Sequence, residues 1–484
     1  LQGAHEELEE VIVSSTRSSR TIADIPTRVE LIAGEELEEK ANMKPGDIRM
    51  LLSESTGIQT QQTSPTSANA SIRIQGLDGR YTQILKDGFP LYAGFSGGLG
   101  LLQTPPLDLK QVEVIKGSTS TLYGGGAIAG LVNLISRVPT DERDLRFMIN
   151  ATSARGLDLS GFYGEKFGKS GLTLFACRNS SQPYDPAGIG LTAIPEFERY
   201  SVNPKFFASL NEKTNLNFGM NFTSEDRIGG DIQLIRGNGN ASQGYFENNE
   251  SKRLSTQLSL SHKLNESFAI NFKNSLSLFD RMIEIPAYRF DGSQASTFTE
   301  ANLVYDKDQY EWIFGLNLWT DEFSENQVLT TPRRNYSHTT AGSFVQNNIK
   351  ISDKVNLESG LRGDYVIDYG FVLLPRISLL YRANVKFSSR VGGGFGYKTP
   401  TIFTEESERM QFQNVLLISP GKNKLEKSYG ANWDLNYRTE IGKVGLSINH
   451  LFFYTYLDNP LMLNLTVQGN YEFVNMAGFT DSKG

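Results

Sequence analysis

Residues 107–137, LDLKQVEVIKGSTSTLYGGGAIAGLVNLISR, decide the fold of this chain. The run begins with the β-branched, apolar residues Val112, Val114 and Ile115, and an extended apolar pattern resumes at residues 132–135. Between the two lies the glycine cluster 124–126, where the backbone can pass close to another surface. The stretch therefore predicts a strand, a glycine-rich turn and a second strand.

A nucleotide-binding loop is the first alternative for the same glycines. Gly124, Gly126 and Ala129 fit the loose pattern G-x-G-x-x-[GA]. That pattern binds a pyrophosphate only when a helix follows it, because the amides at the helix start hold the phosphates. Here a β-prone apolar run follows, and no alternation of strands and helices is visible nearby, so nucleotide binding is not favoured. An ordinary tight turn in a β protein would explain the glycines locally.

From about residue 144 onward, apolar and polar residues alternate. Leu216, Phe218, Met220 and Phe222 are each followed by a small or polar residue, and the same period of two recurs at 254–261 and beyond. Because successive side chains of a strand point to opposite faces, this pattern predicts strands with one apolar face.

The lengths of the connections carry a second signal. Short polar turns and longer connections alternate along the chain, as they do in bacterial outer-membrane barrels, whose periplasmic turns are short and whose outer loops are long. A soluble β-sandwich has no reason to sort its connections in this way. The short turns are 167–171, 211–215, 263–267, 305–309, 351–354, 382–385 and 440–443, and the long connections are 179–198, 226–250, 281–295, 323–337 and 398–424.

Composition narrows the functional classes. The 484 residues have a mean hydropathy of −0.33 and a net charge of −7. No apolar run approaches the ~20 residues of a membrane helix, which leaves a soluble protein or a β-barrel. The acidity argues against nucleic-acid binding. Cys177 is the only cysteine, and His5, His262, His338 and His450 are scattered. We therefore expect no metal site, no cofactor and no enzyme, because no acid, base or metal-ligating set is clustered.

Several segments, in order, resemble TonB-dependent outer-membrane receptors. The 107–137 run is similar to the end of the plug domain of that family. Upstream, residues 51–58, 71–82 and 84–91 are similar to its "L...PGv", "IRG...R" and "vLiDGvpl" segments. Residues 396–403 and 423–430 resemble two barrel segments. Two positions depart from the family pattern: Gln75 stands where arginine is usual, and Lys86 interrupts an apolar run.

This resemblance implies an all-β transmembrane β-barrel with a small mixed α/β plug domain inside its lumen. We expect an N-terminal TonB-box segment at 1–18, the plug at 19–139 and the barrel at 140–484. About fifteen or sixteen strands can be counted, whereas plugged transporters have about 22. The expectation is therefore a chain that lacks about six C-terminal strands, with a complete barrel of about 16 as the alternative.

The resemblance also implies a partner at the N-terminus. Residues 9–16, EEVIVSST, are similar to the TonB box, which pairs as an added strand with the energy-coupling protein TonB, working with ExbB and ExbD. Val11, Ile12, Val13 and Ser14 are the predicted TonB-binding residues. The alternative is a plain first strand of the plug. The location implied is the outer membrane of a Gram-negative bacterium.

A ligand is expected between the plug apex and the long loops. Segments 59–71 and 92–104 lack periodic structure and are rich in small or amide residues, and long loops carry aromatic and cationic side chains that could stack on a ligand or meet an anion. The predicted substrate-binding residues are Gln61, Gln62, Tyr92, Phe95, Arg236, Arg333, Arg334 and Tyr336.

The function implied is active import of a scarce nutrient, with a ferric siderophore as the first choice. Residues 401–420 contain no histidine, which argues against haem. Cobalamin and glycans remain alternatives, as does a passive porin, although a porin would need neither plug nor box. A surface lipoprotein partner is left open.

Overall fold

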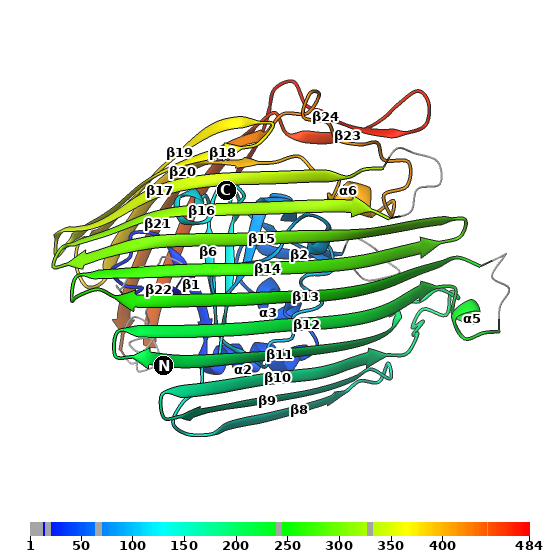
Figure 1. Ribbon diagram of the computed structural model, residues 1–484, viewed down its shortest axis with the longest axis horizontal. Coiled ribbons are helices and arrows are strands. Elements are labelled where there is room, and N and C mark those ends of the chain that lie inside the picture. The colour runs from blue at the N-terminus through cyan, green and yellow to red at the C-terminus, as the bar shows by residue number, and fades with distance from the viewer. Residues whose placement is uncertain (1–12, 15–20, 63–69, 239–243, 327–332, 443) are drawn as a thin grey trace.

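The computed structural model describes residues 13–14, 21–62, 70–238, 244–326, 333–442 and 444–484. A small mixed domain lies inside one wide, curved sheet whose long strands run side by side (Figure 1). Among the described residues, no helix is long and apolar enough to cross a membrane.

The inner domain is built on a five-stranded sheet. Its central strands are the two predicted from residues 107–137, which pair antiparallel, with the four-residue helix α4 (Ser120–Tyr123) between them. Strand β4 runs parallel to β7, and the other pairs are antiparallel. The order is β1 (Val29–Ala33), β6 (Leu109–Lys116), β7 (Gly130–Ser136), β4 (Thr82–Lys86) and β5 (Phe89–Tyr92).

Two helices and a small hairpin complete this plug domain. Leu37 of the helix after β1 is buried while its glutamate neighbours stay at the surface, and Leu51 and Leu52 of the next helix are buried with it against Val112 and Val132 of the sheet. The remaining elements are α2 (Gly34–Met43), α3 (Arg49–Ser53), β2 (Ile58–Gln62), β3 (Ala70–Ile74), and the 3₁₀ turns η2 (Gly79–Tyr81) and η3 (Gly94–Gly97).

The outer sheet has 16 strands, all antiparallel, in the order of the chain. This confirms the all-β fold and the strand count expected for these residues. β8 and β25 are the two ends of the sheet and do not pair with each other in the described residues. The strands are β8 (Asp144–Ala151), β9 (Leu157–Phe167), β10 (Ser170–Ser181), β11 (Glu196–Asn211), β12 (Thr214–Gly230), β13 (Phe246–Lys263), β14 (Phe268–Ile285), β15 (Tyr288–Lys307), β16 (Tyr310–Glu325), β17 (Tyr336–Ser352), β18 (Val355–Val366), β19 (Gly370–Arg382), β20 (Phe387–Lys398), β21 (Glu426–Ile441), β22 (Val444–Asp458) and β25 (Phe479–Lys483).

The alternation of side chains is that of a membrane barrel with a filled lumen. Leu316 and Leu318 of β16 are 65% and 45% exposed on the outside, although they are apolar. Glu225 and Arg227 of β12 point inward and are almost fully buried, although they are charged. An apolar outer band and a polar interior are what a strand needs to face lipid on one side and protein on the other.

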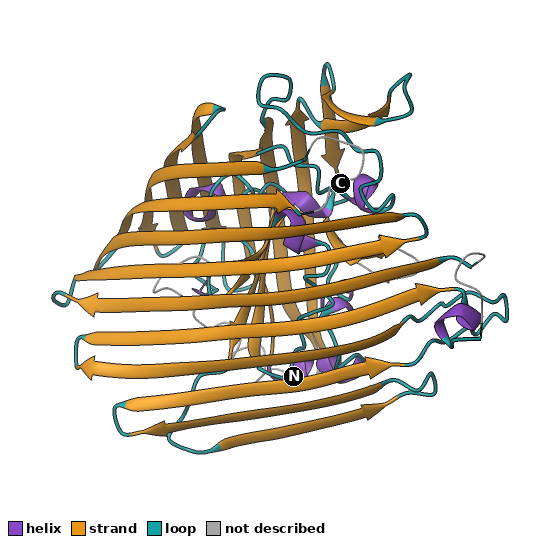
Figure 2. Cartoon of the chain, turned by 45° about the vertical axis from the view of Figure 1, so that its right-hand side comes forward, coloured by secondary structure: helices purple, strands orange, loops and turns teal. Residues whose placement is uncertain are grey.

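Short turns and long connections are only partly separated to opposite ends of the barrel strands (Figure 2). The long ones hold α5 (Ile232–Ile235), α6 (Glu405–Glu408) and the hairpin of β23 (Leu461–Leu465) and β24 (Tyr471–Asn475). The long connection expected at 281–295 is wrong, however. β14 and β15 continue their pairing as far as Ile285 and Tyr288, and Ala287, at φ 64°, closes a tight turn. Strand pairing there satisfies backbone groups that a loop would leave to water.

Candidate ligand-binding site

A cavity of about 240 Å³ lies between the plug and the inner wall of the barrel. The plug contributes the region around η2, the η3 turn and the 123–126 glycine turn. The wall contributes inward residues of β16, β17, β18 and β20 together with the start of the β20–β21 connection. On β16 the lining residues Asn317, Trp319 and Asp321 are two positions apart, so they share the inner face of the strand. The cavity is at the end of the strands where the long connections lie.

The β20–β21 connection, residues 399–425, folds inward onto the plug. The carboxylate of Glu405 in α6 accepts hydrogen bonds from Ser71 and from the guanidinium of Arg73, the latter at 2.5 Å. Glu408 accepts from Arg281 of β14 at 2.9 Å. Thr404 caps the helix, since its hydroxyl accepts from the amide of Ser407. The connection is thus tied both to the plug and to the barrel wall.

An aromatic cluster supports this end of the cavity. The ring of Phe95 packs edge-on against Phe279, Phe290 and Phe323, with centroids 5.4, 5.6 and 5.1 Å apart, and Phe403 lies 5.1 Å away. Phe95 is only 1% exposed. The residue predicted to stack on a ligand therefore lines the cavity while most of its ring is used for packing between plug and barrel.

Other predicted residues take different positions. Arg334 is buried, pairs with Glu325 and donates to the carbonyls of Phe412 and Val415, so it holds the β20–β21 connection in place. The Tyr336 hydroxyl donates to Asp321 at 3.1 Å and so borders the cavity through that residue.

Four further predicted residues do not line the cavity. Gln61 and Gln62 lie in β2, opposite Ser71 and Ala70. Arg236 ends α5 and is exposed, as is Arg333. Tyr92 pairs with Ile84 at the end of β5.

Charged residues of the cavity were missed by the sequence reasoning. Asp321 of β16 accepts hydrogen bonds from Gln294 at 2.6 Å and from Ser296 at 2.9 Å, besides Tyr336. Burial raises the pKa of the Asp78 carboxyl, although Arg80 acts in the opposite direction. The signal that could have found them is the strand period: once the apolar residues of β16 are assigned to the outside, Asp321 must face inward. The missed lining residues are Asp78, Arg80, Trp319, Asp321, His338, Arg362, Asp364, Lys398 and Glu405.

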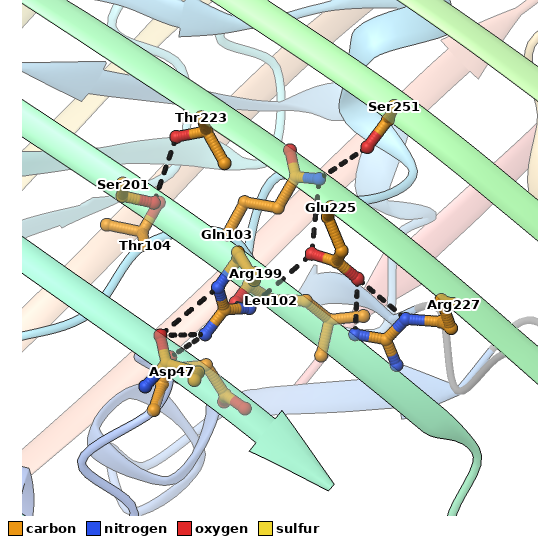
Figure 3. A network of polar contacts seen from close by, with 12 residues as sticks. Asp47, Leu102, Gln103, Thr104, Arg199, Ser201, Thr223, Glu225, Arg227 and Ser251 are labelled. Carbon is orange, nitrogen blue, oxygen red and sulfur yellow. Dashed lines mark hydrogen bonds and ion pairs between the residues drawn. The ribbon is translucent and has the colours of Figure 1, made fainter. Parts of the chain in front are cut away.

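Buried polar contacts hold the plug to the wall (Figure 3). Arg199 of β11 donates to the carbonyls of Leu102 and Gly46 of the plug, and Gln103 of the plug donates to Glu225 of β12 at 3.3 Å. Glu225 also pairs with Arg227 at 2.6 Å. Because charged groups removed from water need partners, these contacts favour one position of the plug within the barrel.

The segment that precedes β1 is held at the other end of the barrel, near the short turns. Side chains of β18–β21 bind nearly every residue from 23 to 28, mostly through backbone carbonyls, so the hold depends little on the sequence of the segment. Arg382 donates to Ala23 and Asp24, Asn356 to the carbonyl of Asp24, Arg390 to that of Ile25 and Ser378 to that of Pro26, Arg376 donates to Thr27, and Arg28 pairs with Asp434.

The predicted TonB box is described only in part. Val11 and Ile12 lie outside the described residues. Val13 is fully buried in a cluster with Ile25 and Leu85, and the amide of Ser14 donates to the carboxylate of Glu113 at 2.9 Å.

Comparison with known proteins identifies the class. Residues 21–131 match the TonB-dependent Receptor Plug Domain, and residues 179–484 match the TonB dependent receptor-like β-barrel. The chain belongs to the TonB-dependent receptor family. Members of this family are transport receptors that interact with TonB, and the barrel fold implies the outer membrane of a Gram-negative bacterium.

Curated relatives differ in what they transport. The vitamin B12 transporter BtuB of Vibrio vulnificus is 30% identical over 126 residues, 26% of this chain and 20% of that protein. The ferric aerobactin receptor of Klebsiella pneumoniae is 30% identical over 29% of this chain and 18% of its own length. The ferrichrome outer membrane transporter/phage receptor of Escherichia coli is 24% identical over 45% and 28%. These matches thus span 18% to 28% of the relatives' lengths.

Solved structures show the same fold. The ferric enterobactin receptor PfeA of Pseudomonas aeruginosa superimposes with a TM-score of 0.73 at 16% identity, covering 95% of this chain and 78% of that one. The siderophore receptor PirA of the same organism has a TM-score of 0.71 at 16% identity, covering 94% and 80%.

Proposed function

We propose that this protein is a TonB-dependent active transporter that binds a scarce nutrient at the cell surface and imports it to the periplasm, with a ferric siderophore as the nutrient. One observation carries the proposal: the cavity and the described N-terminal residues that adjoin the proposed TonB box lie at opposite ends of the same plug. The cavity lies at the end of the strands where the long connections are, and Val13 and residues 23–28 lie nearer the short turns.

The arrangement supports energy-coupled transport rather than passive diffusion. The plug fills the lumen and is tied to the wall by buried ion pairs and hydrogen bonds, so a solute cannot pass without movement of the plug. TonB, driven by ExbB and ExbD, would pair with residues 11–14 and pull on the chain. A passive porin has no use for such a plug. A cobalamin, haem or glycan importer remains the alternative, and a surface lipoprotein partner is compatible with the exposed long connections.

The proposal is tested by transport in cells. The complete receptor is expressed in a strain that lacks its own siderophore receptors, and uptake of radiolabelled ferric chelates and of cobalamin is measured with and without TonB. We expect uptake of one ligand class, lost when TonB is deleted, while ligand binding to the cell surface remains. Equal uptake without TonB would rule out active transport, and a lack of uptake of every ligand would rule out a nutrient importer of these classes.

A further inference from the structure

The charges around the cavity restrict the ligand. Receptors that recognise an anion generally place a surplus of cations around it, because a charged group loses its hydration on binding. Here carboxylates outnumber cations among the lining residues. The carboxylates are Asp78, Asp321, Asp364, Glu405 and Glu408, and the cations are Arg80, Arg362 and Lys398.

Most of these charges already have partners. Arg362 pairs with Asp364 at 2.7 Å, and Arg80 pairs with Glu426 at 3.2 Å. Glu405 and Glu408 are paired with Arg73 and Arg281, as described above. When these outside partners are included, six carboxylates stand against five cations. A ligand therefore meets a site whose arginines are already occupied.

Lys398 is the exception. Its ammonium makes no hydrogen bond or ion pair with any described residue, and the charges that act on it are those of Glu426, Arg80, Asp321 and Asp78. Asp321 accepts hydrogen bonds from three neutral groups, and within the described part of the chain the Asp78 carboxylate accepts only from the backbone amide of Arg80. Among the described lining residues, Lys398 is thus the one cation without an ion-pair partner, and its charge offsets those of Asp78 and Asp321, which form no ion pair either.

The connecting segments outside the described residues do not alter this balance. Residues 63–69 read TSPTSAN, residues 239–243 read GNASQ and residues 327–332 read QVLTTP. None contains a charged side chain.

Resting on the function proposed above, we propose that the cavity selects an uncharged, oxygen-rich ferric chelate of the trihydroxamate class and rejects polyanionic chelates. Three hydroxamates neutralise a ferric ion, whereas three catecholates leave a triply negative complex. The Trp319 ring packs edge-on against Phe298, but neither its indole N–H nor the Lys398 ammonium has a hydrogen-bond partner among the described residues, so both can donate to ligand oxygens.

Tryptophan fluorescence offers a direct test with the complete receptor in detergent, because Trp319 lines the cavity. The probes are ferrichrome, an uncharged trihydroxamate, ferric enterobactin, a trianionic catecholate, and cyanocobalamin, an uncharged corrinoid. Quenching titrations give the affinity for each at low and high salt. We expect ferrichrome to bind at least ten-fold more tightly than ferric enterobactin, with little dependence on salt. Tighter binding of cyanocobalamin would overturn the trihydroxamate assignment, and tighter binding of ferric enterobactin would overturn the argument from charge; both leave the transporter function standing.

Two variants that change the charge of the cavity in opposite directions make the test more specific. Asp321→Asn removes a negative charge. It should raise the affinity for ferric enterobactin, relative to the affinity for ferrichrome, by about ten-fold, which corresponds to ~1.4 kcal/mol of binding free energy. Lys398→Gln removes the cation that has no ion-pair partner and should lower the affinity for ferric enterobactin relative to that for ferrichrome. Movement of both ratios in one direction, or of neither, would contradict the inference. If no probe binds and none is imported, the proposed function itself fails.

Discussion

The ring of Tyr397 lies directly against the backbone of Gly125. A Cβ atom at position 125 would overlap the ring, and the Tyr397 amide donates to the Gly125 carbonyl at 3.1 Å. The Tyr397 hydroxyl donates to Asp364 at 3.0 Å, which fixes the ring from its far side. Gly125 is therefore constrained by the barrel wall, whereas its neighbour Gly124 is constrained by its own φ of 80°. The glycine cluster is thus a point of close contact between the plug and the barrel wall.

Gly125→Ala should loosen this contact. The new methyl group must displace a ring held at both ends, and overpacking of this kind costs about 1–3 kcal/mol. A plug seated less tightly should leak, so cells should become sensitive to large antibiotics that the wild type excludes. Gly126→Ala is the matched control, because a Cβ there meets nothing within 4 Å. Equal leakiness of the two variants would show that the Tyr397 contact is not what matters.

Asp434→Asn should free the segment before β1. Asp434 accepts from Arg28 at 2.5 Å and is 3% exposed in its side chain. Loss of a charged hydrogen bond of this kind costs on the order of 1.5–3 kcal/mol. A spin label at Thr21→Cys, in a Cys177→Ser background, should become more mobile while ligand binding is retained. Glu212→Gln in an exposed short turn serves as the control. An unchanged spectrum would mean that the remaining contacts suffice.

The sequence was enough to predict the architecture, for a physical reason. Lipid outside and protein inside impose a strict period of two on every strand, and that pattern is local. The two strands of the 107–137 run were likewise predictable from β-branched residues flanking glycine. The helix α4 was not, because four residues, STLY, carry no helical period. The unexpected Lys86 became intelligible only in three dimensions, where it pairs with Asp108 at 2.6 Å in the plug core.

The binding site was harder to predict, because its residues are brought together by topology. Arg73 and Glu405 form an ion pair although 332 positions separate them. Arg334 was predicted to bind the ligand because it lies on a long loop. Its guanidinium instead pairs with Glu325 and donates hydrogen bonds to backbone carbonyls. In a sequence, an arginine that contacts a ligand cannot be distinguished from an arginine that holds a loop in place. Only the partners distinguish them, and the partners are set by register and by the folding of the β20–β21 connection.

Acid should weaken one attachment of the plug. Asp87, in the β4–β5 turn, pairs with Lys205 of β11 and accepts from the amide of Ser136 at 2.8 Å. Burial, the largest influence, opposes ionisation, but Lys205, Lys86 and the Ser136 amide outweigh it and lower the pKa of Asp87. A carboxyl with a lowered folded pKa stabilises the fold above its unfolded value of about 3.9, and this stability is lost as pH falls from there through the folded pKa.

The corresponding measurement compares Asp87→Asn with wild type in protease resistance of the plug between pH 7 and pH 3. The variant should be weaker at neutral pH, and the difference should disappear in acid. Asp308→Asn is a matched control, because Asp308 has the same φ of 55° but is exposed in a turn. A difference between wild type and Asp87→Asn that does not shrink at all as pH falls from 5 to 3 would assign the effect to shape rather than charge.

Import should depend on the backbone of residues 11–14. A proline at Ile12 cannot donate a hydrogen bond to an added strand, so Ile12→Pro should abolish energy-coupled uptake. Ligand binding should stay near normal, because the cavity lies at the other end of the plug. Ile12→Val keeps the amide and the β-branched shape and should transport as wild type does. Binding is measured on whole cells at low temperature, and uptake after warming. Should Ile12→Pro cells import normally, TonB must engage another segment, and the burial of Val13 beside Ile25 would then mark a plain structural strand of the plug.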